Sequence, residues 1–264
     1  MNPLVPSTGA FATFVGASAT NMLRIPPTLS YEQGSTIGTC FMTSGLALFY
    51  SLPLNADPAH PPESARAAYV LVSGGATANG TAALQLLQLS GFTPIATCSP
   101  QHFELAKSYG AAAVFDYSSP NCAQDIRTYT KSNLRYAMDC VTTVDSMKLC
   151  YAALGRAGGY YTSLDPFDAV GLTRKTVKAD WVLGPLMMGI EIAWPEPHKR
   201  APDAEVRKFG LHWRALLEQF FGEGKLRTHP IKIETGGFEG ALNGLERVRR
   251  GVVRGEKLVY PIQT

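Results

Sequence analysis

The chain has 264 residues, of which 45% are hydrophobic and 17% are charged. This length allows one large domain or two smaller ones with a sizeable core, and the composition is typical of a globular protein. The net charge of +3 comes from scattered basic residues, which argues against a nucleic-acid partner. No apolar run reaches the ~18 residues of a membrane span, and the first residues lack the features of a secretory signal. The sequence therefore predicts a cytoplasmic protein without a membrane partner.

The five cysteines lie far apart in the sequence, at positions 40, 98, 122, 140 and 150. An odd number of cysteines without a Cys-x-x-Cys pair indicates reduced thiols and argues against a disulfide framework or a structural zinc site. The five histidines also lack metal-ligand spacing. We therefore predict that the protein binds no metal.

The first elements along the chain are short. Residues 11–25 alternate weakly between apolar and polar side chains and predict one or two strands. Ser30 and Gln33 have the spacing of a capping box and predict the start of a helix. Residues 39–52 form a strongly apolar helix that ends at Pro53, and a proline-rich loop follows.

Strands and helices alternate from residue 67. The candidate strands are 68–73, 93–98, 113–116, 134–141 and 158–164, and the candidate helices between them are 79–90, 101–109, 122–130 and 143–153. This order predicts a parallel sheet with right-handed crossovers. The alternation ends after Asp165, beyond which we expect helices at 206–221 and 238–250 and short strands at 229–233 and 257–260.

The turn after the first of these strands is the most informative feature. The apolar run Val70–Val72 precedes glycines at 74, 75 and 80, and apolar residues then recur at helical spacing. Glycines let the backbone approach a pyrophosphate, and the helix start favours its negative charge. Thr77 stands where a middle glycine is usual, so an ordinary turn without a cofactor is the alternative. We predict that the cofactor phosphates bind at Gly74, Gly75, Ala76, Thr77, Ala78, Asn79 and Gly80.

The end of the second strand predicts which nicotinamide cofactor binds. NAD-binding folds place an Asp or Glu there to bond the ribose hydroxyls. The segment Thr97–His102 contains no acid, and Ser99 and His102 can donate to a 2′-phosphate, which favours NADPH. The alternatives are a helix cap for Ser99 and a solvated first-turn side chain for His102.

Several segments resemble a known superfamily. Residues 29–38 (Leu-Ser-Tyr-Glu-Gln-Gly-Ser-Thr-Ile-Gly), 43–47, 103–111 and 255–259 resemble the zinc-independent, quinone-reductase branch of the medium-chain dehydrogenases/reductases. Residues 95–100, 114–117, 153–159 and 164–167 resemble, more specifically, the trans-acting enoyl reductases of fungal polyketide biosynthesis.

The resemblance implies an α/β fold, with a Rossmann-type doubly wound parallel sheet and a remnant of a GroES-like, barrel-shaped catalytic domain. The implied domains are 1–37, the tail of an N-terminally truncated GroES-like domain; 38–192, the NADPH-binding domain; and 193–264, which returns to the catalytic domain. Because the family has most of its barrel before the segment that begins this chain, we expect NADPH binding with slow turnover.

The implied activity is NADPH-dependent reduction of an α,β-unsaturated polyketide thioester in secondary-metabolite biosynthesis. The implied partner is a polyketide synthase or hybrid synthase that carries the substrate on an acyl carrier, and we expect a monomer rather than an oligomer. The cofactor supplies the difficult chemistry, and the protein orients and polarises the reactants.

The resemblance also assigns residues to this site. Thr39 and Thr43 are the implied catalytic residues. Further cofactor-binding residues are Pro100, Gln101, Tyr117, Leu164, Asp165, Arg254, Gly255 and Glu256. The implied substrate-binding residues are Phe41, Met42, Thr43, Ser44, Gly45, Leu46, Ala47, Leu48, Leu186, Met187, Met188, Gly189 and Ile190.

Each assignment has an alternative. Thr43 can instead cap a helix, and the two substrate segments can be helix core. Thr39 stands where zinc-dependent relatives place a cysteine ligand, and Cys40 is one position out of register. For the whole protein, the alternatives are a non-catalytic NADPH-binding or partner protein and a quinone-type oxidoreductase.

Overall fold

A computed structural model describes residues 12, 14–61 and 68–262. The chain divides into two compact units, one formed by Thr43–Leu183 and the other by Met1–Met42 together with Gly184–Thr264. The division into domains at residues 37 and 192 that the family resemblance implies stays a prediction.

A single parallel sheet forms the centre of the unit Thr43–Leu183. Its strands are β1 (Tyr69–Ser73), β2 (Thr93–Cys98), β3 (Ala113–Asp116), β4 (Tyr136–Asp139), β5 (Gly159–Ser163) and β6 (Val177–Trp181). They are ordered β3-β2-β1-β4-β5-β6, and every neighbouring pair is parallel. The predicted Rossmann-type doubly wound sheet is confirmed.

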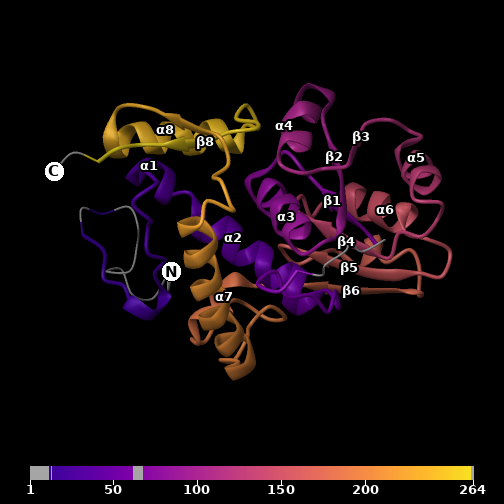
Figure 1. Ribbon diagram of the computed structural model, residues 1–264, viewed down its shortest axis with the longest axis horizontal. Helices are drawn as coiled ribbons and strands as arrows, with labels where there is room; N and C mark the ends of the chain where they lie inside the picture. The colour runs from indigo at the N-terminus through magenta and orange to yellow at the C-terminus, as the bar shows by residue number, and fades with distance from the viewer. Residues whose placement is uncertain (1–11, 13, 62–67, 263–264) are drawn as a thin grey trace. The chain divides into compact units, whose positions relative to one another are not determined.

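Helices cover both faces of this sheet. Helices α3 (Ala78–Leu89) and α4 (Phe103–Ser108) pack on one face, and α5 (Cys122–Tyr129) and α6 (Val144–Ala153) pack on the other (Figure 1). Because both faces are covered, strand β1 is an apolar run whose Val70, Leu71 and Val72 are fully buried. The strand order reverses between β1 and β4, and ligands of such sheets bind beyond the carboxyl ends of the strands at that point.

Strand β6 was not predicted from the sequence. It lies at the edge of the sheet, next to β5. Its buried Val177 alternates with the exposed Lys178 and Asp180, so it lacks the apolar run that marks the inner strands.

The other unit contains short elements around one long helix. These are η2 (Ala19–Asn21), α1 (Tyr31–Gly34), the first part of α2 (Ile37–Leu46), η6 (Gly184–Met188), α7 (Ala204–Gly222), β7 (Ile231–Ile233), α8 (Gly237–Arg249) and β8 (Lys257–Val259). The expected capping box is confirmed, because the Ser30 side chain accepts from the Gln33 N–H while the Gln33 side chain accepts from the Ser30 N–H. Strands β7 and β8 pair in parallel.

The prediction of strands within residues 11–25 is wrong for the part that the structure describes. Residues 14–25 contain only the turn η2, and residues 11 and 13 lie outside the described residues. Phe14 is 86% exposed, so its apolar side chain does not pack as a strand in a core would require.

Helix α2 crosses the division between the units and continues into the π-helical turn η3 (Ala47–Ser51). In its first part, the Phe41 ring packs edge-on against Phe221 at 4.9 Å, and the Phe41 carbonyl accepts a 3.0 Å hydrogen bond from Trp213 Nε1. These contacts fasten the start of α2 to α7.

Candidate cofactor and substrate sites

The glycine turn begins at Gly74, directly after β1. Gly74 has a φ of +80°, and a Cβ there would lie 2.8 Å from Cγ2 of Val141, so a side chain would be strained and crowded. The N–H groups of Gly74 and Gly75 both donate to the Thr97 carbonyl, at 3.1 and 2.9 Å. The turn is therefore tied to the end of β2 by its own backbone.

Thr77 is the N-cap of α3. Its hydroxyl accepts a 3.0 Å hydrogen bond from the Gly80 N–H, and its backbone is extended, as an N-cap requires. Thr77 therefore stabilises the start of the helix at the point where the related pattern has a glycine.

Gly80 lies in the first turn of α3, which begins at Ala78, one residue before the predicted start at residue 79. A Cβ on Gly80 would collide with the Gly74 carbonyl oxygen and lie 2.7 Å from Gly75 Cα. Gly80 is required because the helix packs directly against the turn.

Two observations fit a cofactor pyrophosphate at this turn. The first N–H groups of a helix have no carbonyl partner within the helix and carry a partial positive charge. In addition, the buried Oδ1 of Asn79 has no hydrogen-bond partner among the described residues. Because the two ends of a side-chain amide exchange by a 180° flip, Asn79 can present donors to an anion.

The end of β2 places further predicted residues together. The Ser99 and Tyr117 hydroxyls lie 3.3 Å apart, and Gln101 Nε2 lies 3.2 Å from His102 Nε2. Pro100–His102 form the turn η4, and Tyr117 is exposed. Polar groups that can donate therefore gather at the carboxyl ends of β2 and β3.

Asp116 pairs with Cys98 in the register of β2 and β3 and was not among the residues predicted from the sequence. Its Oδ1 accepts from the N–H and the hydroxyl of Ser118, at 2.9 and 2.7 Å. The carboxylate is thus engaged by its own turn. Strand pairing places this acid beside the end of β2, and that pairing is not visible in the sequence pattern.

The loop after β4 was also missed. The fully buried carboxylate of Asp139 accepts from the N–H groups of Val141 and Thr142, and from the hydroxyls of Ser146 and Tyr161 at 2.7 and 2.9 Å. Burial, and next the Asp139 charge, raise the pKa of Tyr161, so its phenol stays a donor. This network fixes the loop that holds Val141 against Gly74.

The α2 residues fall into two groups. Thr39 is exposed and Thr43 half-buried, one helical turn apart on the same face. Thr43 lies inside α2, so it is not a helix cap. The side chains of Phe41, Leu46, Ala47 and Leu48 are buried, with exposed fractions of 0 to 3%, which favours core for these four.

Two other predicted residues are Ser44, which contacts the glycine turn, and Asp165, which follows β5. The Ser44 hydroxyl donates to the Asn79 carbonyl at 3.1 Å, which joins the predicted substrate segment to the turn. After β5, the Asp165 carbonyl accepts a 2.8 Å bond from the Ser163 hydroxyl, and the Asp165 side chain is exposed. The segments Leu186–Ile190 and Arg254–Glu256 belong to the other unit.

Cys40 is poorly suited to bind a metal. Its thiol donates to the carbonyls of Thr36 and Ile37, and burial raises its pKa above the ordinary value. A cysteine binds a metal ion as the thiolate, and a raised pKa disfavours that form. In the part of the chain that the structure describes, no group of three His, Cys, Asp or Glu side chains is arranged to hold a metal ion.

Known proteins are similar to this chain in sequence and in fold. Residues 78–162 match the family model described as zinc-binding dehydrogenase. The trans-enoyl reductase fsa3 of Fusarium sp. (strain FN080326) is 52% identical over 263 residues, which cover 99% of this chain and 74% of that protein. The trans-enoyl reductase phm4 of Pyrenochaetopsis sp. is 52% identical over 264 residues, 100% of this chain and 72% of that protein.

The chain belongs to the trans-enoyl reductases. They are oxidoreductases, and this member has the fold of the medium-chain dehydrogenases/reductases. The solved structure of the CurK enoyl reductase covers 93% of this trans-enoyl reductase and 67% of its own chain, with a TM-score of 0.70 and 17% identity, and so supports the fold alone. Among the described residues of this trans-enoyl reductase, no helix has both the length and the apolar character needed to cross a bilayer.

Proposed function

We propose that this chain reduces an α,β-unsaturated polyketide thioester with NADPH, and that a partner polyketide synthase delivers the substrate on an acyl carrier. The observation that carries the proposal is the 52% identity to a trans-enoyl reductase over 99% of the chain. Bound NADPH would supply a hydride to the β-carbon of the enoyl group and become NADP⁺, while a proton from solvent is added at the α-carbon.

The cofactor would lie across the carboxyl ends of β1, β2 and β4. The start of α3 and the turn Gly74–Gly80 would hold the pyrophosphate, and Asn79 would donate to it after an amide flip. Ser99, Gln101, His102 and Tyr117 would bind the adenosine end and its 2′-phosphate. Asp116 is turned toward Ser118, which reduces its repulsion of that phosphate.

The substrate end of the proposed site uses Thr39 and Thr43 of α2 as polar groups toward the thioester and the nicotinamide amide. Ser44 links the same helix to Asn79 through its 3.1 Å hydrogen bond. The half-buried Leu186, Met188 and Ile190 would contact the acyl chain, because their side chains are apolar and still accessible.

The test is an assay of NADPH oxidation with purified protein, using an enoyl thioester and, separately, a free quinone. We expect consumption of NADPH with the thioester and formation of the saturated product. Turnover with quinone alone would indicate a quinone-type oxidoreductase, and cofactor binding without turnover of either would indicate a non-catalytic binding protein.

A further inference from the structure

Helix α7 carries two arginines, Arg207 and Arg214, that fasten other segments of the same unit to it. The two arginines differ in what they hold. Arg207 Nη1 donates to the Met187 carbonyl at 2.9 Å and also bonds Asn21 Oδ1, while its Nη2 donates to Thr20 Oγ1 at 2.9 Å. All three acceptors are neutral, so the two-pronged geometry of the guanidinium matters more than its charge.

The turn that Arg207 holds is also packed against α7 by its shape. Met187 is buried, and a Cβ on Gly210 would lie 2.6 Å from Met187 Cβ, so only a glycine lets the turn approach so closely. Near the C-terminal end of this turn, Gly189 has a φ of +72°, and a Cβ there would lie 3.1 Å from Cδ of Arg207. The chain therefore folds back directly over the arginine side chain.

We infer that Arg207 is a positioning residue that fixes the turn Gly184–Ile190 on α7 and thereby sets which acyl chains the reductase accepts. The inference rests on the proposed function, because that function places Leu186, Met188 and Ile190 against the acyl chain. Arg207 and Gly210 hold Met187, the residue between Leu186 and Met188, from two sides. A shift of Met187 therefore moves both neighbouring side chains.

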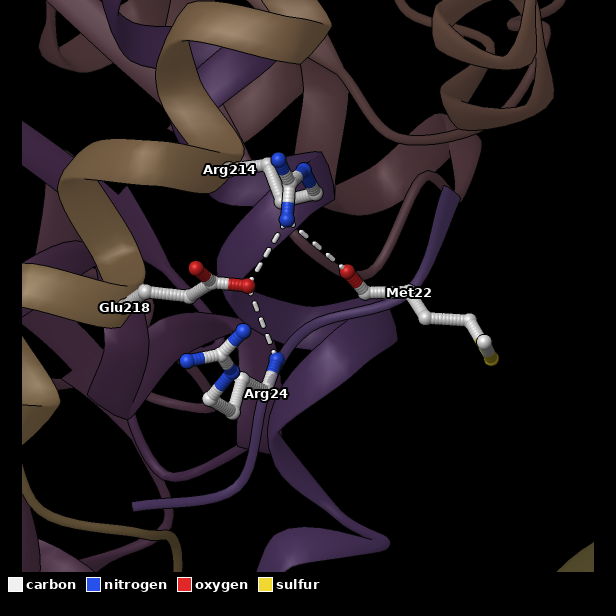
Figure 2. Close-up of polar contacts among 4 residues, drawn as sticks. All are labelled: Met22, Arg24, Arg214 and Glu218. Atoms are coloured by element: carbon white, nitrogen blue, oxygen red, sulfur yellow. Dashed lines mark hydrogen bonds and ion pairs between the residues drawn. The ribbon is translucent and has the colours of Figure 1, made fainter. Parts of the chain in front are cut away.

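Arg214 provides a matched control on the same helix. Its Nη1 donates to the Met22 carbonyl at 3.2 Å and to Glu218 at 2.8 Å, and Glu218 accepts from the Arg24 N–H at 2.8 Å (Figure 2). Arg214 thus holds Met22 on α7 directly and Arg24 through Glu218, as Arg207 holds residues 20 and 21, but among the described residues it makes no hydrogen bond to the turn Gly184–Ile190. A comparison of the two arginines separates the turn from general anchoring of the N-terminal segment.

The experiment compares Arg207→Met, Arg207→Lys and Arg214→Met with the unaltered chain, in two measurements. The first is amide hydrogen exchange of residues 184–190 in the free protein. The second is kcat and KM for two enoyl thioesters, one with a short acyl chain and one with a longer, branched chain, together with the NADPH dissociation constant.

For Arg207→Met we expect faster exchange in residues 184–190 and a loss of about tenfold in the preference between the two thioesters, since pocket contacts commonly discriminate by that order. The loss should appear in KM, with an unchanged NADPH dissociation constant. Arg207→Lys should recover only part of the preference, because an ammonium lacks the planar fork. Arg214→Met should preserve both the exchange and the preference.

The inference is overturned if exchange in residues 184–190 is unchanged in Arg207→Met, if Arg214→Met has the same effects, or if both thioesters lose activity equally. If the unaltered chain reduces neither thioester, the proposed function fails and the specificity claim fails with it. The exchange measurement then still decides whether Arg207 positions the turn.

Discussion

The hydroxyls of Ser99 and Tyr117, 3.3 Å apart, lie where the 2′-phosphate of NADPH is proposed to bind. A carboxylate at this point repels a phosphate and accepts from ribose hydroxyls instead. We expect Ser99→Asp to weaken NADPH binding by about tenfold or more, equivalent to at least ~1.4 kcal/mol, and to leave NADH binding nearly unchanged. Cofactor fluorescence titration measures both constants, and an equal loss for the two cofactors would contradict the assignment.

Asp116 provides a second test of the proposed 2′-phosphate position, because its substitution removes a negative charge where Ser99→Asp adds one. Because its Oδ1 is held by Ser118, we expect Asp116→Asn to strengthen NADPH binding by no more than about threefold, as for a screened surface charge. A much larger gain would show that Asp116 faces the cofactor. The titration used for Ser99→Asp also serves for this variant.

Gly80 permits the contact between α3 and the glycine turn. An added methyl group would collide with the Gly74 carbonyl, so we expect Gly80→Ala to lower the free energy of unfolding by about 1–3 kcal/mol and to weaken NADPH binding. The control is Gly222→Ala in α7, where a Cβ meets nothing within 4 Å and alanine favours the helix. Urea unfolding measures both variants, and an unchanged free energy of unfolding in Gly80→Ala would refute the close contact.

At this scale, the glycine turn and the acid-free polar segment after β2 could be recognised from the sequence because those signals are local, whereas the contact between Ser99 and Tyr117, 18 residues apart, was not predicted. Asp116 and Asp139 were missed because their relation to the site comes from strand register and from a fold-specific buried network. Thr77 was noticed as a departure from the pattern, and its role as an N-cap became clear only from the start of α3.

The loop between β4 and α6 is an element whose shape depends on one buried carboxylate, Asp139. The Tyr161 phenol is 1% exposed and donates to Asp139 at 2.9 Å. We expect Tyr161→Phe to lower the free energy of unfolding by about 1–3 kcal/mol because it removes one partner of a buried charge. Urea unfolding measures this value.

Tyr160→Phe is the matched control for that variant. Tyr160 directly precedes Tyr161 in β5, so its side chain lies on the opposite face of the sheet, where its ring stacks on that of Tyr136 with the centroids 5.9 Å apart. A loss of stability in Tyr160→Phe as large as in Tyr161→Phe would argue against a specific role for the Asp139 network.

The sequence correctly predicted elements with a strong apolar signal: β1 as a continuous apolar run, and α3 and α7 as helices with apolar residues at helical spacing. Strand β6 was missed because it is an edge strand with exposed charges. The strands expected before residue 26 were wrong for residues 14–25, because weak alternation in exposed residues does not distinguish a strand from an extended loop.

The molecule as a whole should lose stability at alkaline pH through its buried thiols. Burial, and next Asp116, raise the pKa of Cys98 from 9.0 to about 11; burial, and next Asp125, do the same for Cys122. The folded state therefore holds these protons more tightly than the unfolded state. The resulting stabilisation is complete below pH 9 and is lost as the pH rises toward 11.

Urea unfolding at pH 7, 9 and 10.5 checks this dependence. We expect the stability to fall between the last two values, and the fall to be smaller in Cys98→Ala, which removes one of the thiols. An identical fall in Cys98→Ala would show that other groups cause the alkaline loss.

The central claim is that the carboxyl ends of β1, β2 and β4 form an NADPH site. The most direct measurement is titration of the purified 264-residue chain with NADPH and NADH, followed by cofactor fluorescence. We predict saturable NADPH binding, at least about tenfold tighter than NADH binding, that is weakened in Gly80→Ala. Equal affinity for the two cofactors, or NADPH binding that survives unchanged in Gly80→Ala, would contradict it.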